Sequence, residues 1–209
     1  MRVIAGEFRS RPIKTLEGLA TRPTPDRLRE ALFNVLQTRI EGAVFVDAHA
    51  GSGAVGIEAL SRGARQVVFI EKSKDAAGII RDNLHALRAG ARTRLIQGSA
   101  TSHLGALNAD IIFLDPPYEM VKEYEKAFRS LSDESKCLVI AQHATREKLP
   151  ESYGAFRRTR VIRQGDNSLS FYSVAVDDAV GAEAEDAVAP ADGVAEESGA
   201  PHGGAEPVA

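Results

Sequence analysis

The chain has 209 residues and a formal net charge of −3, from 26 lysines and arginines against 29 acidic residues. This length accommodates one ordinary domain, or one domain and a tail. A single cysteine excludes a disulfide framework and indicates a reducing compartment. The sequence contains neither an apolar run of about 18 residues nor the apolar core of a secretory signal, so we expect a cytoplasmic protein with no membrane partner.

The charge is unevenly divided along the chain. Residues 177–209 hold nine acidic residues and no lysine or arginine, which leaves residues 1–176 with a net charge of +6. The same segment lacks aromatic residues, leucine and isoleucine, so it cannot bury enough apolar surface to offset the entropy of ordering. We therefore expect three parts: a basic arm and helix at residues 1–40 packed on the core, a core domain at 41–176, and a disordered acidic tail at 177–209.

The basic body alternates between strand and helix patterns. Two short apolar stretches in residues 2–15 predict an N-terminal hairpin, and a helix is expected from Pro25 to Leu36. Strand patterns then lie at Val44–Asp47, Val67–Ile70, Leu95–Gln97, Ile111–Leu114, Leu138–Ala141, Phe156–Ile162 and Leu169–Val176, and helical patterns at Ala54–Arg62, Lys74–Ala89 and Val121–Leu131. Seven strands that alternate with helices predict a doubly wound α/β domain, whose sheet is mostly parallel and covered on both faces.

A glycine-rich loop follows the first of these strands and leads into a helix. Glycines at 51, 53 and 56 suit a tight turn and a close approach of backbone to a ligand, and the helix N-terminus offers free N–H groups. Glu71 ends the next strand, twenty residues after Gly51, where a carboxylate is placed to accept hydrogen bonds from both hydroxyls of a ribose. The loop alone fits two cofactors, a nicotinamide dinucleotide and S-adenosylmethionine.

The residue that opens this loop favours S-adenosylmethionine. The Asp47 carboxylate would attract the ammonium group of a methionine but would repel a pyrophosphate. Because the run from Asp47 to Gly53 also resembles the first motif of Rossmann-like methyltransferases, we expect S-adenosylmethionine as cofactor and no metal. His49 in this run is expected to be a packing residue. The expected cofactor contacts are Asp47, Ala50, Gly51, Ser52, Gly53, Glu71, Ser99 and Asp115.

A second motif, Asp115-Pro116-Pro117-Tyr118, follows the buried strand Ile111–Leu114. Open α/β sheets bind ligands at this edge. The Asp115 carboxylate and a proline carbonyl form a pair of acceptors for the two hydrogens of an exocyclic amine, and Tyr118 offers a flat face for a base. Holding both N–H groups favours a pyramidal nitrogen whose lone pair can attack a methyl group, so positioning suffices for catalysis. We therefore predict Asp115, Pro116, Pro117 and Tyr118 as catalytic residues.

The tetrad resembles the signature of methyltransferases that act on exocyclic amines. Together with the segments Arg22–Asn34 and Gly51–Ala64, it makes residues 1 to about 176 resemble the bacterial 16S ribosomal RNA guanine-N2 methyltransferase family. This resemblance implies a Rossmann-like class I methyltransferase, with an N-terminal arm, that methylates a guanine of small-subunit ribosomal RNA. It also implies a monomer that acts on an assembly particle. Two departures are Ala48-His49, where the family has Leu-Phe or Leu-Tyr, and Ser99, near the position where many methyltransferases place an aspartate against adenine.

Three alternatives share parts of this pattern. An adenine-N6 methyltransferase has the same tetrad and glycine loop, although one that acts on DNA usually needs a recognition domain for which the body leaves little room. A nicotinamide-dependent oxidoreductase uses the same glycine loop but does not explain the tetrad. A catalytically silent RNA-binding assembly factor on the same fold is disfavoured by the intact tetrad.

The N-terminal region carries the basic residues expected to face RNA. Residues 1–40 hold eight arginines and lysines against four acids. Guanidinium groups bind phosphate oxygens in a bidentate manner, so this region predicts a salt-dependent affinity for RNA. The target guanine must leave its stack to reach the catalytic residues, which favours a loop or single strand. The expected RNA contacts are Arg9, Arg11, Arg22, Arg27 and Arg29.

Overall fold

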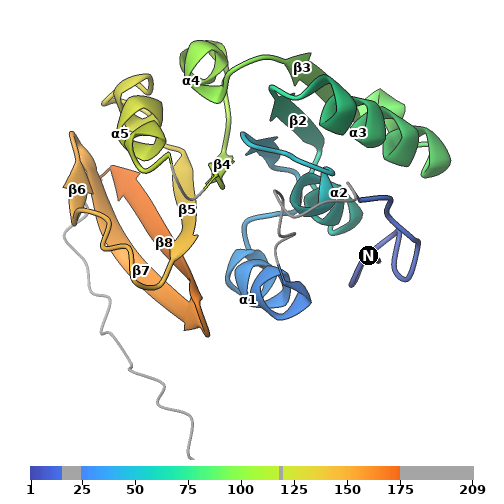
Figure 1. Ribbon diagram of the computed structural model, residues 1–209, viewed down its shortest axis with the longest axis horizontal. Helices are drawn as coiled ribbons and strands as arrows, with labels where there is room; N and C mark the ends of the chain where they lie inside the picture. Colours follow the sequence, from blue (N-terminus) through green and yellow to red (C-terminus); the bar gives the residue numbers. More distant parts are fainter. Residues whose placement is uncertain (16–24, 118–119, 175–209) are drawn as a thin grey trace, which may run out of the picture. The chain divides into compact units, whose positions relative to one another are not determined.

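The computed structural model describes residues 1–15, 25–117 and 120–174 (Figure 1). The chain divides into two units, Met1–Val176 and Asp177–Ala209, and the second lies outside the described residues, as do Arg22 and Tyr118. No helix within the described ranges is both long enough and apolar enough to cross a membrane.

The core is an eight-stranded sheet in the order β3-β2-β1-β4-β5-β8-β7-β6. Its strands are β1 Val44–Asp47, β2 Gln66–Glu71, β3 Thr93–Gln97, β4 Ile111–Leu114, β5 Leu138–Ala144, β6 Ser152–Tyr153, β7 Phe156–Gln164 and β8 Asn167–Val174. The first five strands are parallel, and β8 enters antiparallel between β5 and β7. The predicted α/β fold with a mostly parallel sheet is confirmed. The described strands exceed the predicted seven by one, because β6 has two residues and is too short to produce a periodic pattern.

The described residues form five α-helices and two 3-10 turns. They are α1 Asp26–Leu36, α2 Ala54–Ser61, α3 Lys74–Ala86, α4 Ala100–His103 and α5 Lys122–Arg129, with turns at Gly90–Arg92 and Leu104–Ala106. Of these, α1 precedes β1 and the others lie between strands. The helix expected from Pro25 begins one residue later at Asp26, with Pro25 as its N-cap. A proline lacks the backbone N–H, so it suits the boundary where no intrahelical donor is required.

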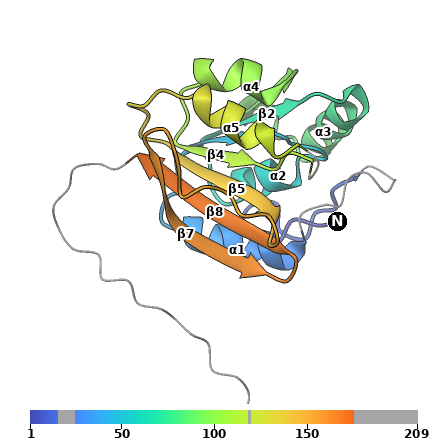
Figure 2. The same ribbon diagram turned by 60° about the vertical axis from the view of Figure 1, so that its left-hand side comes forward.

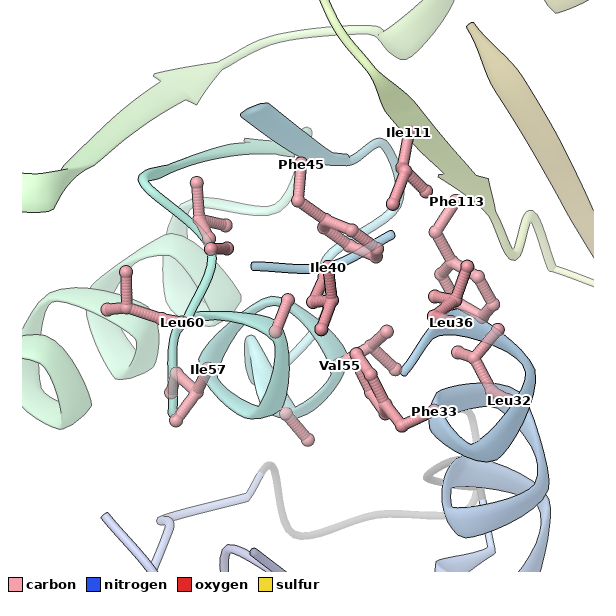
Figure 3. Packing of buried hydrophobic residues seen from close by; sticks show 14 of the residues in the cluster. Leu32, Phe33, Leu36, Ile40, Phe45, Val55, Ile57, Leu60, Ile111 and Phe113 are labelled. Atoms are coloured by element: carbon pink, nitrogen blue, oxygen red, sulfur yellow. The ribbon is translucent and has the colours of Figure 1, made fainter. Parts of the chain in front are cut away.

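Helices cover both faces of the sheet (Figure 2), and the alternation of side chains along each strand creates two cores. Phe45 and Phe113 point to the face that packs against α1, α2 and α3 (Figure 3). Val46 and Leu114, one residue further along the same strands, point to the face that packs against α4 and α5. Because both faces are buried, the central strands read as continuous apolar runs in the sequence.

The N-terminal arm, residues 1–15, packs against α2. Its two apolar stretches meet in a single antiparallel bridge, Arg2 to Pro12, so it is less regular than the predicted hairpin. Gly6 has a φ of +82°, and a Cβ there would lie 1.9 Å from the carbonyl oxygen of Ser61. Only glycine allows this approach, which lets the Glu7 N–H donate to the same oxygen at 2.8 Å.

Candidate active site

The order of the strands creates a switch point between β1 and β4. The chain continues from β1 to β2 on one side, while β4 lies on the other, with Asp47 paired to Phe113 in parallel register. The Ala48 N–H extends this pairing by donating to the carbonyl oxygen of Phe113 at 3.0 Å. The glycine loop after β1 and Asp115 after β4 therefore leave the sheet at the same edge, where open α/β sheets bind ligands. We call this the strand-end edge.

The glycine loop is shaped by backbone geometry and by Asp47. Gly53, the N-cap of α2, has a φ of +80°, a conformation that other residues rarely adopt. A Cβ on Gly56 would lie 2.3 Å from the Phe69 ring, so this glycine is required where α2 packs on the sheet. The buried Asp47 carboxylate accepts the Gly56 N–H at 2.9 Å and thereby holds the first turn of α2. Its contact with a methionine ammonium stays a prediction.

Burial sets the charge behaviour of Asp47. Desolvation, with a smaller contribution from the Glu71 carboxylate, raises the pKa of Asp47 to about 7, against the opposing hydrogen bond from Gly56. A positive charge brought to the loop would favour the ionised form. Asp47 is therefore poised to respond to a cationic ligand even though its side chain is only 1% exposed.

Glu71 lies half-buried at the end of β2, beside the loop. One carboxylate oxygen accepts the Gly51 N–H and the other accepts the Ser73 N–H, each at 2.7 Å. These bonds fix the carboxylate, and each oxygen retains a lone pair that can accept a hydroxyl. The arrangement fits the ribose diol that the sequence predicts for this position.

Ser99 is brought to the same edge by β3. It is the half-buried residue that precedes α4, and its hydroxyl lies 2.9 Å from that of Thr101. The neighbouring Gly98 N–H donates to the backbone oxygen of Glu71 at 3.0 Å, which places the turn after β3 next to the end of β2. Ala50 is held to β2 as well, through the Ile70 carbonyl at 3.1 Å. The predicted cofactor residues from three strands thus share one edge.

Asp115 stands half-buried just beyond the end of β4, followed by the buried Pro116 and the exposed Pro117. One of its carboxylate oxygens accepts a hydrogen bond of 3.0 Å from the Nε2 atom of Gln142 on β5. Sequence reasoning missed Gln142, because nothing in the pattern of β5 distinguishes it. Only the order of the strands shows that it lies beside Asp115. The predicted role of Tyr118 falls outside the described residues.

His49 occupies the loop position where a packing residue is expected. Its Nδ1 atom is buried without a hydrogen-bond partner in the described part of the chain, which is rare for a buried polar atom. Burial lowers the pKa of His49 to about 4, although the nearby Glu123 carboxylate acts in the opposite direction. The imidazole is therefore neutral at neutral pH.

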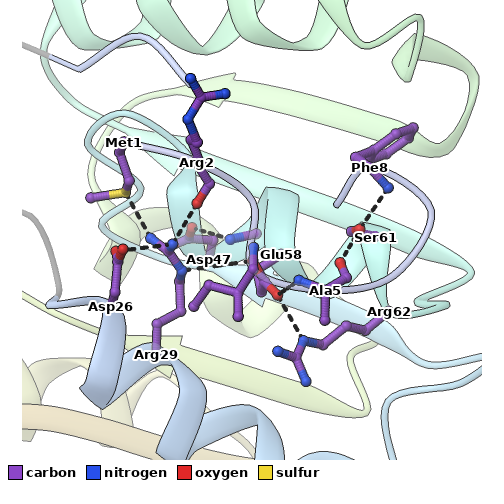
Figure 4. A network of polar contacts seen from close by, with 12 residues as sticks. Met1, Arg2, Ala5, Phe8, Asp26, Arg29, Asp47, Glu58, Ser61 and Arg62 are labelled. Carbon is purple, nitrogen blue, oxygen red and sulfur yellow. Dashed lines mark hydrogen bonds and ion pairs between the residues drawn. The ribbon is translucent and has the colours of Figure 1, made fainter. Parts of the chain in front are cut away.

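One of the predicted RNA contacts is wrong. Arg29 is 0% exposed, and its guanidinium donates to the backbone oxygen of Arg2 at 2.7 Å and to Asp26 at 3.2 Å (Figure 4). Its Nε atom lies 3.7 Å from the Glu58 carboxylate, so the cation serves to fix the arm. The signal was present in the sequence: Arg29 shares helical spacing with the buried residues Leu32 and Leu36.

The other predicted RNA contacts in the described residues are on the surface. Arg9 and Arg11 lie on the arm and Arg27 on α1, and all three are exposed. The guanidinium of Arg11 donates to the Ala86 carbonyl at 2.9 Å at the end of α3. These side chains remain candidates for phosphate contacts.

Comparison with known proteins assigns the chain to a family. A family model described as conserved hypothetical protein 95 matches residues 1–173. The chain belongs to this family. The predicted membership of the chain is thereby confirmed, and so are the Rossmann-like methyltransferase fold and S-adenosylmethionine as the cofactor.

Relatives and solved structures agree with this assignment. A Bacillus subtilis protein named "Putative rRNA methyltransferase YlbH" is 34% identical over 182 residues, which cover 82% of this chain and 98% of the relative. The Escherichia coli K12 ribosomal RNA small subunit methyltransferase D is 39% identical over 120 residues, 56% of this chain and 60% of that protein. The structure of "Putative methyltransferase yhhF from Escherichia coli" has a TM-score of 0.71 at 32% identity and covers 83% of this chain and 97% of its own.

Proposed function

We propose that the protein transfers a methyl group from S-adenosylmethionine to the exocyclic N2 amine of a guanine in 16S ribosomal RNA. The observation that carries this proposal is the parallel register of β1 and β4, with Asp47 beside Phe113. This register places the glycine loop and the Asp115-Pro116 acceptors at one edge, so a donor and an amine can meet there. The names of the relatives support ribosomal RNA of the small subunit as the substrate.

The cofactor is held by groups already in place. The Gly51–Gly53 turn and the N-terminus of α2 receive the methionine end, the Glu71 carboxylate receives the ribose, and Ser99 lies at the adenine end. When bound, S-adenosylmethionine supplies an electrophilic methyl group on a positively charged sulfur. The loop needs no rearrangement to present these groups, since Asp47 and Glu71 already fix both of its ends.

The amine is activated by acceptors and not by a strong base. The Asp115 carboxylate and the Pro116 carbonyl accept the two N–H groups of the guanine amine, which localises the nitrogen lone pair. Bound S-adenosylmethionine would supply the methyl group to this nitrogen, with its sulfur leaving as a neutral thioether, and the Asp115 carboxylate would accept the proton that the nitrogen loses. Tyr118, outside the described residues, supplies a stacking face for the base. Positioning of this kind accounts for much of the rate of such transfers.

The RNA reaches this edge across a basic surface. The exposed Arg9, Arg11 and Arg27, with Arg22 beyond the described residues, contact phosphates next to the cofactor loop. The protein acts as a monomer on an assembly particle of the small subunit, in which the target guanine lies in a loop or single strand. Such a base leaves its stack at a cost of only a few kcal/mol.

Methyl labelling tests the proposal directly. The protein is incubated with methyl-labelled S-adenosylmethionine and 16S ribosomal RNA, either naked or in partly assembled subunits, and the nucleosides are analysed. We expect the label in N2-methylguanosine. Label in N6-methyladenosine would instead establish the adenine alternative, and RNA binding without any label would establish the silent assembly factor.

A variant of the catalytic aspartate assigns the reaction to this edge. Asp115→Ala should abolish methyl transfer and leave the affinity for S-adenosylmethionine largely intact, as measured by calorimetry. Asp133→Ala, at an exposed acidic residue after α5, is the matched control and should behave like the wild type. Undiminished transfer by Asp115→Ala would remove the tetrad from the mechanism.

A further inference from the structure

Gln142 is a buried polar side chain in the middle of the sheet, and the reaction as described above does not use it. It lies on β5, is 2% exposed, and follows Ala141, which is paired in parallel register with Leu114 of β4. Asp115 and Gln142 are therefore the next residues along two adjacent strands. The Nε2 atom of Gln142 donates to Oδ2 of Asp115 at 3.0 Å.

The backbone of Gln142 is fixed from the opposite side of the sheet. Tyr124, a buried residue of α5, donates its hydroxyl to the carbonyl oxygen of Gln142 at 2.5 Å. A continuous chain of hydrogen bonds thus runs from α5 through β5 to the aspartate after β4. The amide of Gln142 is attached to backbone that is held on both sides, by the Tyr124 hydroxyl and by the strand pairing.

This amide restricts what Asp115 can do. An amide nitrogen can only donate hydrogen bonds, so it favours the ionised carboxylate over the protonated one. It also engages one of the two carboxylate oxygens and fixes the rotation of the group. The direction of the second oxygen is then fixed as well. An acceptor of a substrate N–H requires such a fixed direction.

We infer that Gln142 is a positioning residue for amine methylation: it holds Asp115 ionised and oriented so that the carboxylate accepts the exocyclic amine. This inference rests on the proposed function. Asp115 touches the amine, whereas Gln142 acts through Asp115.

Two substitutions at Gln142 test the inference. Gln142→Leu removes the donor while leaving the backbone bond to Tyr124. It should lower kcat by about 10- to 100-fold, the effect of losing one hydrogen bond to a charged group, and leave KM for S-adenosylmethionine unchanged. The acid limb of the pH–rate profile should move to higher pH, because an unsupported carboxylate protonates more readily. Gln142→Glu, of the same shape, should move that limb further, because two adjacent carboxyl groups disfavour a second charge.

The control is Gln66→Leu. Gln66 is an exposed glutamine at the start of β2, at the end of the sheet away from the strand-end edge. This variant should match the wild type in kcat, in KM for S-adenosylmethionine and in its pH–rate profile. A kcat of Gln142→Leu within about twofold of the wild type, with a coincident pH–rate profile, would overturn the inference. Should Gln142→Leu fail to fold, the isosteric Gln142→Glu decides through its acid limb. The assay follows transfer to whichever amine the wild type methylates. A wild type without activity refutes the proposed function, whereas an active wild type with an indifferent Gln142 refutes only this inference.

Discussion

Glu58 on α2 and Asp115 after β4 are both acidic side chains, yet their surroundings are opposite. The Glu58 carboxylate is fully buried and receives the Ile4 and Ala5 N–H groups and the guanidinium of Arg62, at 2.8 to 3.0 Å. With Arg29, these groups form what we call the arm cluster. Asp115 is half-buried and stands at the end of a strand. The donors around Glu58 hold the arm on α2, whereas Asp115 lies at the strand-end edge, where a carboxylate can serve a substrate.

Breaking the arm cluster should give the largest change in stability. Glu58→Gln removes the negative charge that faces the buried guanidinium of Arg29 and the half-buried one of Arg62, and places an amide against backbone donors. We expect a loss of about 3–5 kcal/mol in the free energy of unfolding, measured with urea. Glu41→Gln, at an exposed glutamate before β1, is the control. A loss below about 1 kcal/mol would mean that the cluster is no more stabilising than a surface ion pair.

A pH series should show how His49, in the loop at the strand-end edge, contributes to the free energy of unfolding, and so distinguish this edge from the arm cluster. Its pKa is about 4 in the folded protein and 6.5 as a free group, so below pH 6.5 the unfolded chain binds a proton that the folded protein excludes. The folded state therefore loses stability as the pH falls from 6.5 to 4. Relative to His49→Phe, the wild type should lose up to about 3 kcal/mol across this window.

The difference in the free energy of unfolding between the wild type and His49→Phe isolates the contribution of the histidine. Asp47 has a raised pKa of about 7 and acts in the opposite direction, because its stabilising contribution is lost as the pH rises through 7. That contribution is present in both proteins and cancels in the comparison, because the pKa of Asp47 is set by burial, the Gly56 N–H and Glu71 and not by His49. A difference independent of pH would show that His49 is solvated in the folded state.

A substitution of Glu71 at the strand-end edge should affect ligand binding more than stability, in contrast to the substitution of Glu58 in the arm cluster. Glu71→Gln removes a charged acceptor for the ribose hydroxyls, so the affinity for S-adenosylmethionine measured by calorimetry should fall about 10- to 100-fold. Glu134→Gln, an exposed glutamate after α5, is the control. Unchanged affinity would remove Glu71 from the cofactor site.

The smallest effect is expected from the arginines of α1, which divide between the two roles. Arg27→Ala would remove one of the proposed phosphate contacts, so the dependence of RNA affinity on salt should weaken by about one unit of slope. Arg65→Ala, an exposed arginine at the opposite edge of the sheet, should leave the slope unchanged. An unaltered slope for Arg27→Ala would exclude α1 from the RNA-binding surface.

The sequence predicted those features that depend on local pattern. The apolar run that ends at Asp47 and the glycines that follow it identified the turn from β1 into α2, since both signals lie within a few residues. Glu71 and Asp115 were expected at the carboxyl ends of parallel strands because each directly follows an apolar run, and the structure places both residues there. Their approach to the same edge followed from the α/β pattern alone.

The features that were missed depend on contacts between distant segments. Arg29 was read as surface because arginines usually are, and its burial requires the arm to bring Arg2 and α2 to bring Glu58. The pairing of β4 with β5 brings Gln142 next to Asp115, and the local sequence pattern of β5 does not reveal this pairing. The sequence thus predicted Asp115 as a site residue but gave no indication of Gln142, its hydrogen-bond partner.

The place of β8 in the sheet has a consequence for synthesis. β5, which carries Gln142, pairs on its outer side with β8, the last described strand of the chain, and not with the strand that follows it. A chain emerging from the ribosome therefore exposes the open edge of β5 until residues 167–174 have been made. Truncations that end before Asn167 should aggregate even though they contain every residue of the strand-end edge. Completion of the sheet thus depends on residues 167–174, which are synthesised after every predicted residue of the strand-end edge.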